Sequence, residues 1–299
     1  MLERPHVSVL IANVNGSPMI ESCLEALESQ ESAELAEIIV ADATDDETRA
    51  MMSRRFPRVR VLAFPRRTSI PVLRTAAFDA SRAPIVAVTE DHCVPGERWL
   101  EEILRAHHDH ASVVGGPVEN GSRDRLVDWA VFFCEYARNM SPVADGESRD
   151  IPGVNAAYKR EILARHRDDM ERGFWEGIIH PMLIAEGERF VSSPRIVVVH
   201  KKRFGYFYFM SQRFHYSRYY AGTRVARATA PTRLVYAAAT ALLPPLLAYR
   251  MTREVLGKRR HLGAYALSFP ILATFLGMWA IGECAGYLFG PGESLSRIE

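Results

Sequence analysis

Residues 89–93 read Thr-Glu-Asp-His-Cys, which places two carboxylates and one imidazole at three consecutive positions. The side chains of Glu90, Asp91 and His92 carry oxygen and nitrogen atoms of the kind that bind divalent cations. A cation held there would neutralise a diphosphate and make it a better leaving group. The segment therefore predicts a divalent-cation site that also contacts phosphate. The alternative interpretation is a group of solvated surface residues.

A further carboxylate lies beside a large aromatic side chain in the segment Arg-Gly-Phe-Trp-Glu-Gly, residues 172–177. Trp175 can exclude water from Glu176 and raise the pKa of its carboxyl group towards that of a general base. Glu176 is therefore the candidate to accept a proton from an attacking hydroxyl group. His180 follows one turn later on an expected helix, where a single histidine is either a further ligand or a structural residue.

Charged residues that could bind a nucleotide follow the second apolar run of the chain. Asp42 ends that run, where a carboxylate can accept hydrogen bonds from a ribose or a base edge. At least one of the next acidic residues, Asp45 and Asp46, is expected to cap a helix that begins near Glu47. Three arginines further along match phosphate geometry, with solvated surface charge as the alternative. They are Arg66, Arg67 and Arg74.

The first 90 residues alternate short β-branched runs with helical stretches, the pattern of a mostly parallel sheet with crossover helices. A helix is expected after Ser17 and Pro18, because serine caps free amides and proline fits the first turn. Asp42 and the cluster at residues 90–92 each come directly after such a run, at the edge where open α/β sheets bind ligands. The expected strands are residues 7–12, 38–41, 59–63 and 85–88, with a small-residue turn at 153–157 and a helix at 175–185.

Two apolar segments, residues 234–249 and 262–289, follow a basic and aromatic stretch at residues 200–222. The second segment exceeds the roughly 20 residues that cross a hydrocarbon core of about 30 Å, and we expect it to span a membrane. The first segment is shorter. Pro244 and Pro245 are expected to break its helix, which favours a re-entrant or interfacial position. Two core helices of a soluble or oligomeric bundle are the alternative.

Basic residues lie between the two apolar segments, and membrane loops rich in lysine and arginine stay in the cytoplasm. Both flanks of the first segment are therefore expected to be cytoplasmic. The N-terminus lacks the long apolar core of a secretory signal. We expect a domain of residues 1–225 that faces the cytoplasm at the cytoplasmic membrane, followed by a membrane-associated helical segment of residues 226–299.

The composition argues against several classes of protein. A hydrophobic share of 48% with 24% charged residues is typical of a globular chain. A net charge of +1 argues against a nucleic-acid partner. Four widely spaced cysteines predict neither a zinc site nor a disulfide framework, and they favour a reducing compartment. Neither a Gly-x-Gly-x-x-Gly motif after the first strand nor a Gly-Lys-Ser/Thr loop occurs, so a dinucleotide site and a P-loop are not supported.

Five segments together resemble glycosyltransferase family 2, whose GT-A fold is an α/β fold with a mostly parallel central sheet. Residues 7–16 resemble the opening strand and donor loop, and residues 38–48 resemble the strand end that contacts the nucleotide. Residues 89–100 look like a variant of the segment that holds the Asp-x-Asp metal motif. Residues 153–163 are similar to the acceptor-side segment, and residues 173–177 to the stretch that holds the catalytic base. The resemblance covers residues 5–205, with the five segments in the family's order.

The resemblance implies an inverting enzyme that takes a sugar from a nucleotide-diphosphate donor, with Mg²⁺ or Mn²⁺ as the cofactor. A basic, apolar tail favours membrane lipids as partners and a lipid-linked or saccharide acceptor. The implied residues are Glu176 as catalytic base; Ala12, Asn13, Asn15, Asp42, Arg67, Arg74, Glu90 and Asp91 for the donor; Asn155 and Trp175 on the acceptor side; and Glu90, Asp91 and His92 for the metal.

Two departures from the family pattern leave other classes of function open. His92 stands where the family has its second aspartate, and Ala43 and Thr44 replace the usual Gly-Ser. These departures favour a catalytically silent binding or scaffold protein as one alternative. The other alternative is a nucleotidyltransferase, which would release pyrophosphate and which the lack of a glycine-rich phosphate loop argues against.

Overall fold

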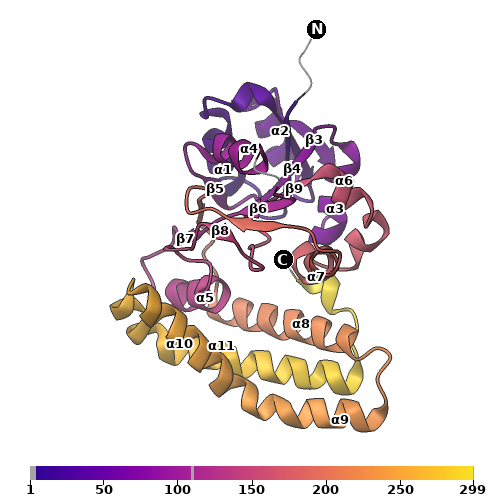
Figure 1. Cartoon of the computed structure of the whole chain (residues 1–299), viewed down its shortest axis with the longest axis vertical. Coiled ribbons are helices and arrows are strands. Elements are labelled where there is room, and N and C mark those ends of the chain that lie inside the picture. The colour runs from indigo at the N-terminus through magenta and orange to yellow at the C-terminus, as the bar shows by residue number, and fades with distance from the viewer. Residues whose placement is uncertain (1–4, 109–110, 299) are drawn as a thin grey trace. The chain divides into compact units, whose positions relative to one another are not determined.

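The computed structural model describes residues 5–108 and 111–298, which form two compact units (Figure 1). The α/β unit takes the chain up to Gly121 and the segment Asn139–Lys202. The helical unit takes the segment Ser122–Arg138 and the chain from Arg203 onward. The chain therefore enters the helical unit twice, so the two units do not follow one another as two uninterrupted stretches of sequence.

An eight-stranded sheet forms the centre of the α/β unit, in the order β3-β2-β1-β4-β9-β6-β10-β8. The pairs β3-β2, β2-β1 and β1-β4 are parallel, whereas β9 runs antiparallel to both β4 and β6. A smaller sheet has the order β5-β11-β7. The fold is thus mixed α/β with a mostly parallel centre, as the sequence predicted. The strands are β1 (Val7–Asn13), β2 (Ala36–Asp42), β3 (Arg60–Ala63), β4 (Ile85–Glu90), β5 (Cys93–Pro95), β6 (Val113–Gly115), β7 (Val118–Asn120), β8 (Gly146–Glu147), β9 (Ala156–Lys159), β10 (Phe190–Ser192) and β11 (Val198–His200).

The order of the strands explains why polar residues gather at one edge of the large sheet. β1 is buried along its whole length, as a strand covered on both faces should be. It pairs with β2 on one side and with β4 on the other, which makes a topological switch point of the kind where open sheets bind ligands. The register places Asn13 opposite Asp42 and Ala12 opposite Glu90. Three strand ends with predicted site residues therefore lie side by side.

Helices connect these strands. Asp45 caps α2, since its carboxylate accepts a hydrogen bond of 2.8 Å from the backbone N–H of Thr48, and the predicted cap is confirmed. The helix expected at residues 175–185 is α7. The helical elements of the α/β unit are α1 (Met19–Glu28), η1 (Ala33–Leu35), α2 (Asp46–Arg55), α3 (Ile70–Ala80), α4 (Trp99–His108), α6 (Arg160–Ala164), η2 (Arg167–Arg172) and α7 (Trp175–Ala185).

The turn expected at residues 153–157 is only partly formed. The chain turns at residues 153–154 but enters strand β9 at Ala156. Small residues such as Ala156 and Ala157 have a weak strand preference of their own. They form a strand here because β4 and β6 lie on either side and both pair with β9. Tertiary pairing, rather than local preference, therefore decides this element.

The helical unit is arranged around α11, which contacts the four other long helices of the unit. The side chains of Ala221, Val225, Ala237 and Tyr287 form a small buried cluster between α8, α9 and α11. The helical elements of this unit are α5 (Leu126–Tyr136), α8 (Tyr206–Arg224), α9 (Ala230–Ala239), η3 (Thr240–Leu242), α10 (Leu243–Lys258), α11 (Leu262–Phe289) and η4 (Ser294–Arg297).

The prediction that Pro244 and Pro245 break the helix of the first apolar segment is wrong. They lie in the first turn of α10, where a helix has no need of their missing N–H groups. The 3-10 turn η3 joins α9 to α10, so the chain is helical from Ala230 to Lys258. This helix and α11 are long and apolar enough to cross a membrane by length and composition, which by itself is weak support for membrane association.

Two glycines of α11 allow a test of how closely this helix approaches α8. A Cβ atom at Gly286 would collide with the backbone oxygen of Arg218 and with Ala221, whereas a Cβ atom at Gly277 would meet nothing within 4 Å. Alanine is about 1 kcal/mol better than glycine inside a helix, but overpacking costs about 1–3 kcal/mol. We expect Gly277→Ala to raise the Tm of the detergent-solubilised protein and Gly286→Ala to lower it, as followed by circular dichroism. Equal rises for the two variants would contradict this close approach.

Candidate active site

Three ligand-type side chains meet at the carboxyl end of β4. The Nε2 atom of His92 lies 3.2 Å from Oε2 of Glu90 and 3.0 Å from Nε2 of His200. Glu90 ends β4, His92 lies in the turn before β5, and His200 ends β11, where it pairs with Cys93. All three side chains are 12% exposed or less. One oxygen and two nitrogen atoms thus converge in a largely buried place.

The electrostatics of this cluster show what holds it together. Burial opposes a charge on His92, but hydrogen bonds to Asp91 and Glu90 raise its pKa to about 9. Burial likewise opposes a charge on Glu90, yet the hydrogen bond from His92 and the charges of His92 and Arg74 lower its pKa to about 2. Burial and the neighbouring His92 lower the pKa of His200. A protonated His92 therefore lies between an anionic carboxylate and a neutral imidazole.

The donor set of this cluster fits a divalent cation. Two Nε2 atoms at 3.0 Å can share one proton or face a common cation, and one carboxylate plus imidazoles is a common set for transition metals. Glu90 and His92 also form a cluster of potential ligand atoms with Cys93, all within 4.8 Å of one another. Burial raises the pKa of the Cys93 thiol well above its usual value, which disfavours the thiolate form that binds metals. Glu90, His92 and His200 could hold a cation, whose binding would displace the Nε2 proton of His92.

Asp91 connects His92 of this cluster with the loop after β1. One carboxylate oxygen accepts hydrogen bonds from the backbone N–H groups of Val14 and Asn15, at 2.9 and 2.8 Å. The other accepts from the Asn15 side chain and from Nδ1 of His92. These four donors occupy the carboxylate, so Asp91 fixes the loop. A metal or donor role for Asp91 and a donor role for Asn15 stay predictions.

Asp42 is the centre of a second polar network, at the ends of β1 and β2. Its buried carboxylate accepts hydrogen bonds from Asn13, Thr44 and Arg49, each at 2.6–2.7 Å. The Asn13 side chain in turn accepts from the backbone N–H of Gly16. Asp42 and Asn13, which the family resemblance assigned to donor binding, are thus adjacent, and Arg49 contacts Asp42. Their role in donor binding stays a prediction. Ala12 is buried and pairs with Glu90, so it lies at the same edge of the large sheet.

Arg74 connects the cation cluster with Glu176. This arginine of α3 is 1% exposed, and its Nη2 atom donates to Glu90 at 2.8 Å. Its Nη1 atom lies 3.5 Å from Oε2 of Glu176, in the first turn of α7. Arg67, in contrast, is exposed in the turn before α3 with a left-handed φ of 68°, and no site contact of this residue is recorded among the described residues. Its role in donor binding stays a prediction.

Glu176 has the properties of a general base. Its side chain is 28% exposed, and Oε2 makes no hydrogen bond within the described part of the chain. Burial raises the pKa of its carboxyl group, although the charge of Arg74 works in the opposite direction. A Cβ atom at Gly153 would collide with this carboxylate, so glycine at that position leaves room for it. A largely desolvated carboxylate of raised pKa can accept a proton from a hydroxyl group.

The remaining predicted residues support the site from the core. The Trp175 ring packs edge-on against Phe78 and Tyr158, with centroids 6.4 and 5.9 Å apart. The buried side-chain amide of Asn155 donates to two backbone oxygens and accepts from Trp99. His180 hydrogen-bonds with the Tyr158 hydroxyl at 2.6 Å, which is a structural role. Acceptor-side roles for Trp175 and Asn155 stay predictions.

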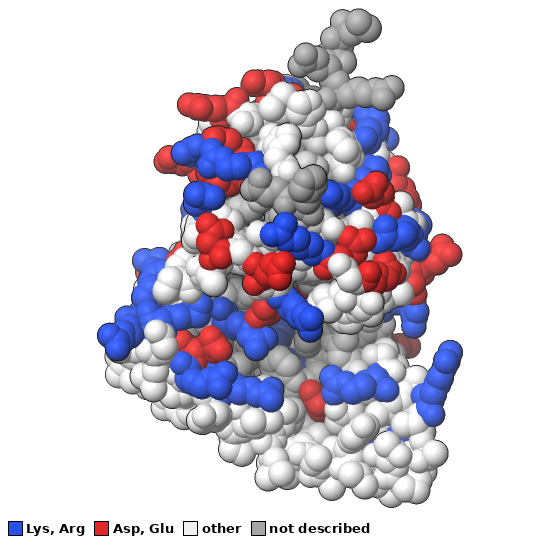
Figure 2. Space-filling model, viewed as in Figure 1, with Lys and Arg blue, Asp and Glu red and all other residues white. Residues whose placement is uncertain are grey.

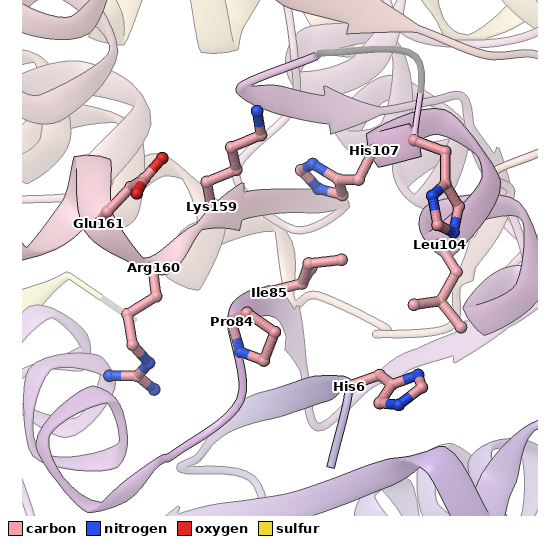
Figure 3. Close-up of a pocket in the computed structure, with 9 residues that line it drawn as sticks. His6, Pro84, Ile85, Leu104, His107, Lys159, Arg160 and Glu161 are labelled. Carbon is pink, nitrogen blue, oxygen red and sulfur yellow. The ribbon is translucent and has the colours of Figure 1, made fainter. Parts of the chain in front are cut away.

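A separate pocket of about 650 Å³ lies at the opposite edge of the sheet (Figure 3). Its lining includes His6 before β1, Pro84 and Ile85 at the start of β4, and Lys159 at the end of the antiparallel β9. The parallel strands begin at this edge, whereas Glu90 lies where they end. The pocket therefore does not belong to the cation cluster.

Comparisons of sequence and structure identify the family and the fold of the chain. The fold is that of a GT-A glycosyltransferase, and residues 8–167 match the sequence profile of Glycosyl transferase family 2. The chain belongs to this family. A similar solved structure is the mannosyltransferase PcManGT from Pyrobaculum calidifontis in complex with GDP-Man and Mn²⁺. It has a TM-score of 0.58 at 19% identity, covering 96% of this chain and 88% of that one, which shows a shared fold.

Curated relatives match a smaller part of the chain. Polypeptide N-acetylgalactosaminyltransferase 12 of Mus musculus is 30% identical over 142 residues, and that of Homo sapiens is 29% identical over the same length. Each match covers 45% of this chain but only 23% of the relative. The similarity thus spans less than a quarter of these relatives' own length.

Removal of His200 tests whether this residue holds a cation, a role that no local pattern in the sequence indicated. We expect His200→Ala to weaken Mn²⁺ binding by at least ten-fold, because loss of even an outer partner of a ligand costs about 10–100-fold. Calorimetric titration with MnCl₂ measures this, with the exposed His6→Ala variant as the control. An unchanged Mn²⁺ affinity in His200→Ala would remove His200 from the ligand set.

Proposed function

We propose that this glycosyltransferase inverts the sugar that it transfers from a nucleotide-diphosphate donor to a hydroxyl group of a lipid-linked or saccharide acceptor. The observation that carries this proposal is that Arg74 makes ion pairs with both Glu90 and Glu176. Glu90 belongs to a cation-type cluster at the strand ends, and Glu176 lies on the other side of the same guanidinium. The residues proposed to hold the leaving group and to act as the base thus contact the same arginine.

Glu90, His92 and His200 would hold Mg²⁺ or Mn²⁺, which supplies positive charge to the departing diphosphate. That a neighbour of the same fold was solved with GDP-Man and Mn²⁺ supports this assignment. Asp91 fixes the loop of residues 14–15, and the network of Asn13 and Asp42 lies where a ribose or base would bind. Arg74 keeps Glu90 charged and in place.

Glu176 would take the proton of the acceptor hydroxyl. The hydroxyl oxygen then forms a bond to the anomeric carbon from the face opposite the diphosphate, and the bond from that carbon to the phosphate oxygen breaks with its electron pair. The configuration inverts, the nucleoside diphosphate leaves, and Glu176 carries the proton. Its raised pKa brings the carboxylate closer to the basicity that a general base needs at neutral pH.

The proposed setting is the cytoplasmic face of a membrane. Two apolar helices and the basic residues around them favour membrane lipids as partners. The net charge of +1 does not favour nucleic acid as a partner. A silent scaffold and a nucleotidyltransferase differ from this proposal in product. Incubated with a panel of nucleotide sugars and Mn²⁺, a silent scaffold would give no turnover, whereas we expect a nucleoside diphosphate. A nucleotidyltransferase would instead release pyrophosphate from a nucleoside triphosphate and a sugar 1-phosphate, a substrate pair on which we expect no turnover.

Substitution of the base separates catalysis from donor binding. We expect Glu176→Gln to lower kcat by about 10²–10⁴-fold, since general-base catalysis contributes that much, and to leave the donor Kd nearly unchanged. Steady-state kinetics and calorimetry measure the two quantities. The surface variant Glu161→Gln serves as the matched control. A kcat for Glu176→Gln within a factor of two of the wild-type value would rule out Glu176 as the base.

The pH dependence of the reaction follows from the same carboxylate. Transfer requires the deprotonated form of Glu176, so kcat should fall as the pH falls through the pKa of this group. Because burial raises that pKa, the acid limb should lie above the ordinary glutamate value of about 4.3. The profile of kcat from pH 4 to 9 tests this, and Glu176→Gln should lose the limb. An acid limb at or below the ordinary value would contradict the assignment.

A further inference from the structure

We propose that the helical unit lies in one leaflet of an anionic membrane, with α9, α10 and α11 parallel to the membrane plane, and does not cross the bilayer. This inference refines the proposed membrane association and differs from the sequence-based expectation that residues 262–289 span. It is argued from contacts within the helical unit alone, and its test does not depend on sugar transfer.

The first observation is that α8 runs alongside α11 in the same direction. The Tyr206 hydroxyl bonds to Thr274 at 2.9 Å, and the rings of Phe209 and Phe275 lie 4.7 Å apart. Further along, Gly282 approaches Ser217, and the Arg224 side chain contacts Tyr287. The contacts advance together from Thr274 to Tyr287. At 1.5 Å per residue, α8 accompanies α11 for about 20 Å.

The remainder of α11 is accompanied by α5. Trp129 packs against His261 with centroids 4.8 Å apart, and Phe133 packs edge-on against Tyr265 at 5.0 Å. One side of α11 is thus covered by protein near its beginning and along its second half. Any path that α11 takes through a membrane is therefore shared by α8 and α5.

α8 is not suited to a hydrocarbon core. It carries Arg213, Arg218 and Arg224, with Gln212 before the first arginine and His215 between the first two. Arg213 is buried with an ion pair of 3.0 Å to Glu135 of α5. Charged residues in the middle of a bilayer are costly, and the five charged residues of these two helices, which include Asp128 and Glu135 of α5, would have to cross together with α11. An orientation in the membrane plane avoids this, because α8 and α5 can stay on the headgroup side.

The second observation concerns the charges at the two ends of the helical hairpin. α9 and α10 run antiparallel to α11, with Tyr236 near Tyr287 and Thr252 bonded to Tyr265. The uncharged part of α9 and α10 lies between Arg233 and Arg250, about 24 Å at 1.5 Å per residue, which is less than the 30 Å of a hydrocarbon core.

Cationic residues flank this uncharged part at both ends. A spanning hairpin concentrates lysine and arginine on one side of the membrane, whereas an in-plane hairpin meets headgroups at both ends. The flanking residues are Arg227 and Arg233 at one end and Arg250, Arg253, Lys258, Arg259 and Arg260 at the other. Their distribution matches one anionic leaflet as the partner, since each cation near such a surface adds to the attraction.

The third observation is a large apolar surface on α9, α10 and α11. In Figure 2 the lower surface of the helical unit is almost free of charged side chains. Eight apolar side chains of residues 230–289 are each 56% exposed or more, which is far from the usual burial of such residues. They are Leu234, Val235, Leu242, Tyr249, Leu256, Leu267, Ile281 and Phe289. An apolar face with cationic ends is the signature of a helix that enters one leaflet.

Chemical labelling distinguishes an in-plane hairpin from a spanning one. Thr229→Cys and Gly257→Cys place thiols at exposed positions near the two ends of α9 and α10, in a Cys284→Ser background because the other native cysteines are buried. The purified full chain is bound to preformed vesicles of phosphatidylglycerol and phosphatidylcholine and treated with a membrane-impermeant maleimide. We expect both thiols to be labelled as fully as after addition of detergent.

Two outcomes would overturn the proposal. If one thiol is protected at least ten-fold until detergent is added, the hairpin spans. If the protein does not float with the vesicles and forms a dimer through this face instead, the apolar surface binds a second copy of the chain.

Charge and apolar variants test the contact surface itself. Flotation of Arg250→Gln with anionic vesicles should fall about five-fold in partition coefficient, as expected for one cation near an anionic surface. Leu242→Glu should reduce partition further, because Leu242 is 71% exposed within the apolar face. Arg54→Gln, an exposed arginine of the α/β unit, is the matched control and should bind as wild type. Equal partition of Arg250→Gln, Leu242→Glu and the control would refute the assigned surface.

Discussion

The proposed active site depends on one buried guanidinium group, which contacts both carboxylates assigned to catalysis. Arg74 is almost fully buried and makes ion pairs with both Glu90 and Glu176, which belong to different elements of the α/β unit. A buried charge is stable only when it is paired, and removal of one partner leaves the other uncompensated. The arginine therefore constrains the end of β4 and the start of α7 together. Arg74 lowers the pKa of both carboxyl groups, yet the two differ: the pKa of Glu90 is low, whereas burial outweighs the charge of Arg74 and raises that of Glu176.

The second constraint on the site is the pairing of strands from two sheets. The parallel strands β1, β2 and β4 bring the polar ends of the large sheet together. The small sheet adds β11, whose antiparallel pairing with β5 places His200 against His92. The carboxylate-imidazole cluster thus depends on both sheets. This explains how an imidazole in place of the family's second aspartate can still belong to a cation-type site.

The helical unit is stabilised by helix packing rather than by strand pairing. Its helices pack through glycines at Gly282 and Gly286, where α8 and α11 approach closely, and through buried aromatic rings. The same helices leave large apolar side chains exposed on their other side. A face of this kind in water would be costly, and the proposed position in one bilayer leaflet would remove it from water.

The sequence by itself determined the local features: the four N-terminal strands within two residues, the helix α7, the Asp45 cap, and the presence of acidic groups after β2 and β4. These features depend on residues only a few positions apart, so pattern and propensity are sufficient to predict them. The tertiary structure alone decided that Asp91 binds the loop 76 residues before it, and that His92 meets His200, 108 residues later. It also decided that residues 156–159 form a strand and that α8 accompanies α11. Contacts of this kind depend on strand register and helix packing between distant segments, and no local spacing encodes them.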